Sequence, residues 1–268
     1  MTIQLLGTGA AEGIPAIYSS TRVSDYARQH GGRDVRTRCS ALIDGRIKID
    51  FGPDSLYQIH RDRLDAREWE GLVFTHSHDD HFARSELQYF LFPFSSETEM
   101  PFPIYANESI CNQIGETYPD WPFELVQTRS FETFSLVDYQ LTPIRAHHMD
   151  DEDAQNLIFQ KDGKTMLYAT DTGKWFDETW EFIRDWRLDL LVIECTNGAA
   201  FSDYDGHLGV GTLGDVLERL RQQGTLGTQT PVVSTHHSHN GDATFAELQE
   251  LLAPLGVTAG YDGLQVSV

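Results

Sequence analysis

Basic residues are scarce in this sequence. The chain carries 20 Lys and Arg against 41 Asp and Glu, which gives a formal net charge of −21 at pH 7. Nonspecific affinity for nucleic acid comes from Lys and Arg side chains that neutralise phosphates, so this balance argues against a polynucleotide partner. A small anionic substrate is compatible with it, because bound metal ions can supply positive charge locally. We therefore expect a small-molecule substrate and no nucleic-acid polymer.

Cysteines and long apolar runs are also scarce. The three cysteines, Cys39, Cys111 and Cys195, stand far apart and form neither a CxxC pair nor a disulfide framework, which is typical of buried thiols in a reducing compartment. No apolar run approaches the roughly 20 residues that a membrane-spanning helix needs. The first residues, "MTIQLLGTGAAEGIPA", lack the basic and apolar regions of a signal peptide and predict a strand instead. We expect a cytoplasmic protein without a membrane partner; a homodimer is compatible with the sequence.

Strand patterns alternate with helical ones along the chain. Two β-branched runs surround Asp44-Gly45 in "SALIDGRIKIDFG", and two more surround Asp162-Gly163 in "NLIFQKDGKTMLYATDTG", so each segment predicts a hairpin. Apolar residues follow helical spacing in "DSLYQIHRDR", "SELQYFLF", "ETWEFIRDWR", "LGDVLERLRQQG" and "ATFAELQELLAPLG". No linker rich in Gly, Ser or Pro interrupts the series. The order predicts one α/β domain over residues 1–268, with two sheets in the middle and helices outside.

The glycines of "LLGTGAAEG" partly match a dinucleotide-binding fingerprint. Their spacing is GxGxxxG, one residue longer than the common form, and Pro15 follows where the fingerprint requires a helix. The stretch therefore predicts a glycine-rich turn that lets a loop pass close to an active site.

The stretch "FTHSHDDH", residues 74–81, indicates half of a metal site. His76 and His78 are two residues apart, so in an extended segment they face the same side. Asp80 and His81 follow where the chain should turn, and could serve a second ion about 3.5–4 Å from the first. Imidazole and carboxylate together suit Zn, Mn or Fe. The alternative is a solvated acidic loop that holds histidines by chance.

The missing ligands should lie at the ends of other strands. Three apolar runs stop at polar side chains: "LTPIRAHH" at His147 and His148, "TMLYATD" at Asp171, and "PVVSTHHSH" at His236 and, further on, His239. If each run is a strand, these side chains could converge on one rim. Alternation along the strand before the histidine pair favours His147 over His148 as the residue that faces the site.

These motifs carry a resemblance to a known family. "THSHDDH" is similar to the HxHxDH signature of the metallo-β-lactamase superfamily, and the later His, Asp and His follow in the family's order over nearly the whole chain. The resemblance implies a four-layer αβ/βα sandwich with a dinuclear site at one edge. It implies that the first metal binds His76, His78 and His147, that the second binds Asp80, His81 and His236, and that Asp171 bridges both.

A narrower resemblance concerns the substrate. "GTGAAEGIPA", "RTRCSALIDG" and the "THxSH" pattern at residues 235–239 are similar to the phosphoribosyl cyclic phosphate phosphodiesterases of phosphonate breakdown, which implies a small, cyclic phosphodiester. Relatives carry a cysteine cluster after "GxPA" that binds a structural zinc with the second histidine of "THxSH". The corresponding stretch here has no cysteine. We therefore expect no structural zinc and no metal role for His239, and residues 16–38 could gate the substrate instead.

A dinuclear centre predicts hydrolysis by a metal-bridging hydroxide. Two divalent ions lower the pKa of a bound water and neutralise phosphoryl oxygens, while Asp80 or Asp171 would orient the nucleophile. The subfamily resemblance places a substrate-facing histidine near "DGHLGVG", so His207 is the candidate general acid or phosphate contact. A solvated loop histidine is the alternative. Glu194 ends a buried run and could bind a metal or support a ligand.

Other activities of the fold stay open at this point. Thioester or lactone hydrolysis is not separated from phosphodiester hydrolysis by sequence. A tRNA-processing nuclease would need a basic arm, which the charge disfavours. A di-iron electron-transfer protein would carry a carboxylate in place of His78 and a flavin domain. A cofactor-biosynthesis accessory protein would tend to lose ligands, whereas here every ligand position can be filled, which favours an enzyme.

Overall fold

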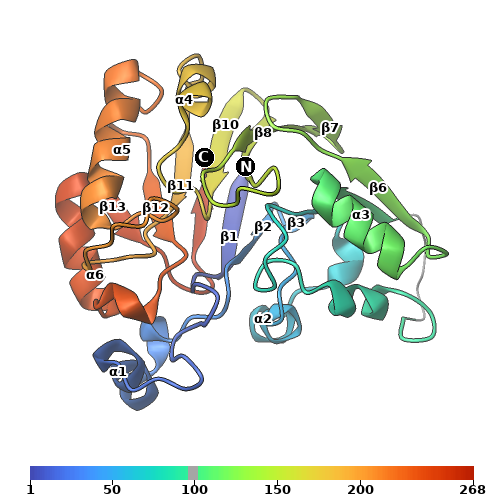
Figure 1. Cartoon of the computed structure of the whole chain (residues 1–268), viewed down its shortest axis with the longest axis horizontal. Helices are drawn as coiled ribbons and strands as arrows, with labels where there is room; N and C mark the ends of the chain where they lie inside the picture. The colour runs from blue at the N-terminus through green and yellow to red at the C-terminus, as the bar shows by residue number, and fades with distance from the viewer. Residues whose placement is uncertain (96–101) are drawn as a thin grey trace.

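A computed structural model describes residues 1–95 and 102–268, and two seven-stranded sheets form its centre (Figure 1). The first sheet has the order β14-β1-β2-β3-β4-β5-β6. Its strands are β1 (Thr2–Gly7), β2 (Ser40–Ile43), β3 (Ile47–Ile49), β4 (Gly71–Val73), β5 (Phe102–Ala106), β6 (Phe123–Gln127) and β14 (Gln265–Ser267).

The second sheet has the order β13-β12-β11-β10-β9-β8-β7. Its strands are β7 (Phe134–Leu136), β8 (Tyr139–Arg145), β9 (Gln155–Lys161), β10 (Lys164–Ala169), β11 (Leu190–Glu194), β12 (Val232–Thr235) and β13 (Val257–Ala259). Strands β3 to β6 and β10 to β13 run parallel, so within each of these groups the carboxyl ends lie at one edge.

Helices cover the outer face of each sheet. In Figure 1, α2 and α3 lie on the side of the first sheet, and α4, α5 and α6 lie on the side of the second. Their bounds are α2 (Ser55–Asp62), α3 (Glu108–Thr117), α4 (Asp177–Ile183), α5 (Val210–Gln223) and α6 (Phe245–Leu252), and a further helix, α1 (Arg22–His30), precedes them. No helix in the described part of the chain is both long enough and apolar enough to cross a membrane.

Strands buried on both faces explain the four layers. Along β10, Met166 and Tyr168 face the core between the sheets, while Leu167 and Ala169 face the core beneath the outer helices. A sheet with apolar residues on both faces must be covered on both. The predicted αβ/βα sandwich is therefore confirmed.

The two predicted hairpins are present. β2 pairs with β3 and β9 pairs with β10, both antiparallel. At the turns, Asp44 and Gly45 have φ of 48° and 73°, and Asp162 and Gly163 have φ of 51° and 72°. Positive φ at both central residues suits Asp-Gly and matches the right-handed twist of the flanking strands.

The N-terminal glycines form a turn and not a nucleotide-binding helix start. A side chain at Gly7 would lie 1.9 Å from the carbonyl oxygen of Arg38, so the two chain segments can pass only if residue 7 is glycine. Beyond it, Ala10 N donates to His237 O at 2.9 Å, which places this segment beside the loop after β12. The predicted glycine-rich turn therefore runs beside the loop that follows β12.

Two helices were not predicted, and one predicted helix differs in type. α1 lies inside the stretch 16–38, where Val23 and Ala27 pack against Ile14 in a small core of their own. α3 was also missed. The stretch "SELQYFLF" forms the 3₁₀ helix Arg84–Phe90. The remaining four helical predictions coincide with α2, α4, α5 and α6.

Candidate metal centre

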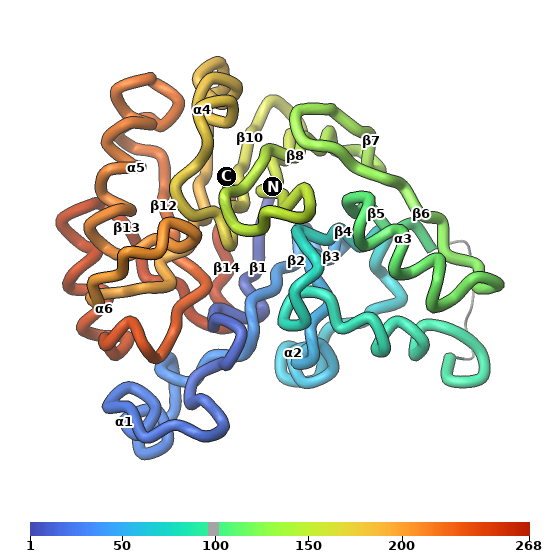
Figure 2. Tube along the Cα trace, in the orientation of Figure 1, coloured from blue at the N-terminus to red at the C-terminus, as the bar shows by residue number. Residues whose placement is uncertain are grey.

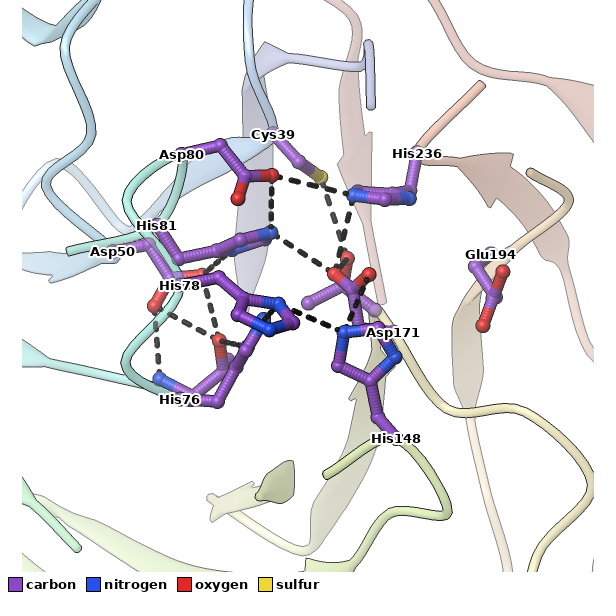
Figure 3. A network of polar contacts seen from close by, with 12 residues as sticks. Cys39, Asp50, His76, His78, Asp80, His81, His148, Asp171, Glu194 and His236 are labelled. Carbon is purple, nitrogen blue, oxygen red and sulfur yellow. Dashed lines mark hydrogen bonds and ion pairs between the residues drawn. The ribbon is translucent and has the colours of Figure 1, made fainter. Parts of the chain in front are cut away.

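Polar side chains from both sheets meet where their parallel strands end (Figure 3). The segment after β4 contributes residues 76–81 from the first sheet. The second sheet contributes three loops, which follow β8, β10 and β12. Figure 2 shows the loop after β8 in yellow-green, crossing the centre of the molecule in that view. The predicted convergence of strand ends on one rim is therefore seen in the structure.

Three histidines form a first set. His76 Nε2 lies 3.0 Å from His78 Nδ1, and His148 Nε2 lies 3.0 Å from the same His78 nitrogen. Their ring nitrogens are close enough to serve one ion. Three imidazoles form a donor set that suits zinc and similar transition metals.

Asp80, His81 and His236 form a second set. His81 Nε2 lies 3.1 Å from Asp80 Oδ2, and His236 Nε2 lies 3.7 Å from the same oxygen. The three side chains are buried and offer ligand atoms within reach of one ion. His236 has a φ of 54°, so the backbone turns sharply where β12 ends and brings its ring toward the first sheet.

Asp171 lies between the two sets. Its Oδ2 is 2.9 Å from His81 Nε2 and 3.2 Å from His236 Nε2, whereas its Oδ1 is 3.5 Å from His148 Nε2. One carboxylate oxygen therefore faces each set. The residue is 3% exposed and has a φ of 45°, a backbone conformation that is uncommon for a residue other than glycine.

Two orphaned nitrogens show that the cluster fits metal ions. His81 Nε2 and His236 Nε2 are buried and make no hydrogen bond to any residue that the structure describes, although carboxylate oxygens lie close to both. Buried polar atoms without partners are rare in native proteins and need an explanation. A cation shared between these ring nitrogens and carboxylate oxygens would explain why they face one another without hydrogen-bond geometry.

The electrostatics of the cluster agree with this fit. Burial, together with the nearby His81, lowers the pKa of His76 well below its usual range, which keeps the imidazole neutral. Burial opposes charge on His81 as well, but Asp80, Asp171 and Asp50 outweigh it and raise the His81 pKa well above the usual range. The carboxylates thus favour a positive charge at this position, and a bound metal ion would supply it in place of the proton, because a histidine ligand must be neutral. For Asp171, burial would raise the pKa, but His236 and His81 outweigh it and hold the pKa well below the usual range. Burial would likewise raise the pKa of Asp80, but His81 and His236 outweigh it and lower that pKa, so both carboxylates are ionised, as metal ligands must be.

The structure places His148, and not the predicted His147, in the first set. β8 ends at Arg145, so the strict alternation behind that prediction does not extend to the histidine pair. The amide of His147 donates to Thr172 O at 3.0 Å, and its ring nitrogen Nδ1 lies 2.9 Å from Lys174 O. The choice of His147 is corrected on this geometry. The other predicted residues, His76, His78, Asp80, His81, Asp171 and His236, all lie in the cluster.

His207 lies beside the second set and is held by Glu194. Its Nδ1 is 3.0 Å from Glu194 Oε2 and 3.8 Å from Asp171 Oδ1, and its ring stacks on that of His236. Burial opposes charge on His207, but Glu194 and Asp171 outweigh it and raise its pKa to about 9. His207 also lines a cavity of about 240 Å³ with Tyr204 and the start of α5. It is therefore not a solvated loop histidine.

Glu194 is buried and accepts hydrogen bonds from several segments, whereas the sequence indicated only that it could bind a metal or support a ligand. Its carboxylate accepts hydrogen bonds from the amides of Thr172 at 2.7 Å, Gly173 at 3.0 Å and Leu208 at 3.2 Å. Thr196 Oγ1 donates to it and lies 2.9 Å from His236 Nδ1. The carboxylate thus braces the loop after Asp171, the His207 segment and the ring of His236.

Asp50 braces the other side of the site and was missed. It follows β3, accepts from the amide of Thr75 at 2.8 Å, and has its Oδ2 2.7 Å from His81 Nδ1. A carboxylate on the far nitrogen of an imidazole fixes its tautomer and orientation. The signal was present in "KIDFG", where a buried strand ends at an Asp.

His239 lies apart from the cluster. Its Nδ1 is 2.9 Å from Thr21 Oγ1 and 3.4 Å from Ser19 Oγ, and its Nε2 is 3.6 Å from Glu12 Oε1. Hydroxyl groups thus face this histidine in the stretch without cysteines. His237, two residues earlier on the chain, is buried and has its Nδ1 near Cys195 O at 3.3 Å, so it points away from the cluster.

Comparisons with known proteins place the chain in a family and show which solved structures share its fold. A model of the β-lactamase superfamily domain matches residues 45–237, and no curated protein matches the chain. A solved structure of a new diphosphatase from the PhnP family has a TM-score of 0.77 at 23% identity, covering 100% of this chain and 97% of that one. Zinc-bound PqqB from Methylobacterium extorquens has a TM-score of 0.74 at 16% identity, with 100% of both chains covered. The short form of human tRNase Z has a TM-score of 0.65 at 18% identity, covering 100% of this chain and 99% of that one.

These structural likenesses, all below 25% identity, show a shared fold, while the family match spans well over half of the chain. The chain therefore belongs to the metallo-β-lactamase superfamily, with the fold of that superfamily's metal-dependent hydrolases and a resemblance to the PhnP family.

Proposed function

We propose that this protein is a metal-dependent phosphodiesterase that uses two divalent ions to cleave a small, cyclic or linear, phosphodiester. One observation carries the proposal: two sets of three ligand side chains are joined by Asp171, which turns one carboxylate oxygen toward each set. Two ions held a few ångströms apart suit an in-line displacement at phosphorus, because attacking and leaving oxygens are both stabilised.

His76, His78 and His148 would hold one ion, and Asp80, His81 and His236 the other, with Asp171 shared. When bound, such ions supply Lewis acidity and lower the pKa of a coordinated water. Zn and Mn both suit this mixture of imidazole and carboxylate, and Fe is compatible with it. Asp80 supplies the carboxylate of the second set, with its Oδ2 3.1 Å from His81 Nε2 and 3.7 Å from His236 Nε2, and is proposed to orient the attacking water.

His207 is proposed to protonate the leaving oxygen. Its Nδ1 faces Glu194, which leaves Nε2 of the imidazolium as a proton donor. With a pKa of about 9 the ring stays protonated at neutral pH, as a general acid must be. The contact with Glu194 also fixes the ring, so the proton is delivered from one position.

The size of the cavity beside His207 and the net charge of the protein both favour a small substrate. The cavity beside His207, of about 240 Å³, is smaller than the typical pocket for a drug-sized ligand and suits a compact leaving group. The net charge of −21 disfavours a polynucleotide. Among the similar folds, a diphosphatase acts on a phosphate compound, which supports phosphorus chemistry here.

The test combines metal content with a panel of substrates. Purified protein loaded with Zn or Mn should contain two ions per chain and hydrolyse bis(p-nitrophenyl) phosphate faster than a thioester, a lactone or a precursor tRNA. His76→Ala should abolish hydrolysis, whereas His30→Ala, at an exposed histidine on α1, should not change it. Faster cleavage of the thioester or lactone would refute the phosphodiester assignment, and full activity of His76→Ala would refute the site.

A further inference from the structure

Glu152 connects two loops of the candidate metal centre. It lies in the loop between β8 and β9, which carries His148 and is closed at its base by the hydrogen bond from Ala146 N to Ala154 O at 2.8 Å. From this loop, Glu152 Oε1 accepts a hydrogen bond from the amide of Ser77 at 2.7 Å. Ser77 is the residue between His76 and His78.

The hydrogen bond from Ser77 to Glu152 fixes a segment that lies outside any helix or strand. β4 ends at Val73, so His76 and His78 lie in irregular chain beyond the strand. From the side of the second sheet, two hydrogen bonds reach the backbone of this segment as the structure describes it: Gln155 N donates to Thr75 O at 2.9 Å, and Glu152 accepts from the amide of Ser77. Together they set where the His76–His78 segment lies relative to the loop of His148.

The chemistry of the carboxylate points to a role beyond simple stability. Glu152 Oε2 is buried and has no hydrogen-bond partner among the residues that the structure describes. Glu152 as a whole is half-buried, but a carboxylate oxygen that is shielded from water without a partner costs desolvation free energy, which the single amide hydrogen bond of the other oxygen offsets only in part. Such a group is typical of a functional position, where geometry is maintained at a cost in stability.

We propose that Glu152 is a positioning residue for the first ion. By binding the Ser77 amide it fixes His76 and His78 at the separation from His148 that one ion requires, and so sets the affinity for that ion. The proposal rests on the metal-binding part of the proposed function and adds to it a residue that touches neither metal nor substrate.

The neighbouring acidic residues do not share this role. Asp153 turns toward another segment, where it accepts from the amide of Ser130 at 2.9 Å and from its hydroxyl at 2.6 Å. Asp151 is exposed. Asp151 therefore offers a matched control, because it carries the same charge in the same loop without a contact to a ligand segment.

The experiment measures metal retention in three variants. Zinc-loaded wild type, Glu152→Ala, Glu152→Gln and Asp151→Ala are titrated with a chromophoric zinc chelator, and the free energies of unfolding of the metal-free proteins are compared in parallel. Glu152→Ala should bind one of the two zinc ions about 10- to 100-fold more weakly than the wild type does, which is the range expected when a contact that supports a ligand is lost. Glu152→Gln keeps a carbonyl acceptor for the Ser77 amide and should restore most of that affinity. Asp151→Ala should match the wild type.

The outcomes separate this inference from the function on which it rests. Wild type that binds no zinc would refute the metal centre itself. Wild type that binds two ions, together with Glu152→Ala of unchanged affinity for both, would refute only the positioning role. An equal loss of affinity in Asp151→Ala, or in Glu152→Gln, would mean that the negative charge of the loop and not the Ser77 contact matters, and would also overturn the proposal. If Glu152→Ala does not fold, the Gln variant decides between the contact and the charge.

Discussion

Replacing Lys48 by Met tests whether a buried amine in the first sheet makes the stability of the fold depend on pH. Lys48 lies on β3, is fully buried, and donates to Ser40 Oγ and to the backbone carbonyls of Ile49 and Asp50, all of them neutral groups. Burial outweighs the more distant carboxylate of Asp50 and lowers the pKa of Lys48 from 10.5 to about 7. The folded protein therefore gives up this proton more readily than the unfolded chain.

The sign and size of the effect follow from this shift. Below pH 7 both states carry the proton, so the cost of burying the charge is constant. Between pH 7 and 10.5 the unfolded chain keeps the proton and the folded protein loses it, so the free energy of unfolding rises with pH. Each pH unit in that window is worth about 1.4 kcal/mol, and the whole window about 5 kcal/mol. In Lys48→Met this contribution is absent.

Urea unfolding of both proteins from pH 6 to 10 provides the assay. The free energy of unfolding of Lys48→Met minus that of the wild type should be constant up to pH 7 and then fall by about 1.4 kcal/mol per pH unit. Taking the difference removes the contributions of the other titrating groups. Lys164→Met, at an exposed lysine on β10, should show no such trend. A difference between Lys48→Met and wild type that does not vary with pH would refute the reasoning.

Four further predictions concern the site and the chain around it. His148→Ala should lower zinc affinity by at least about tenfold in a chelator titration, while His147→Ala should leave it unchanged. Glu194→Gln removes the charge that raises the pKa of His207, so the alkaline fall in kcat/KM should move from near pH 9 toward pH 6.5. Gly7→Ala should cost about 3 kcal/mol of unfolding free energy in urea, because a methyl group there meets a backbone carbonyl. Raising the salt concentration should increase kcat/KM for an anionic phosphodiester but not for a neutral ester, because screening weakens repulsion by the net charge of −21.

Much of the site was predictable because its ligands follow buried strands. A run of apolar residues that stops at His or Asp marks both the end of a strand and the rim where parallel strands end, so Asp171 and His236 could be named as candidates without contacts, and the family resemblance then gave them their roles. The two Asp-Gly hairpins were predictable for a local reason, since positive φ at both turn positions restricts the sequence. In these places the short-range pattern alone specifies the structure.

The remainder depends on contacts between distant segments. His148 was not separable from His147, because the backbone after β8 is set by the bond from His147 N to Thr172 O, and alternation does not continue past the strand. Asp50 also follows a buried strand, but its role was missed because its partner His81 lies far away in the sequence. Glu152 was missed because Ser77, whose amide it binds, is equally distant. α1 was missed because its apolar face is small and packs against a loop, so little periodicity marks it.

The arrangement of the supporting carboxylates explains why the centre requires both sheets. Asp50 follows β3 and orients His81, while Glu194 ends β11 and holds His207 and, through Thr196, His236. Each half of the molecule thus aligns its own imidazoles from a buried strand end, yet neither half supplies a full set for two ions. Ions bound between the halves would bind the native state only and would stabilise it by mass action. The same contact between sheets that builds the site would therefore make metal binding and the packing of the two sheets mutually dependent.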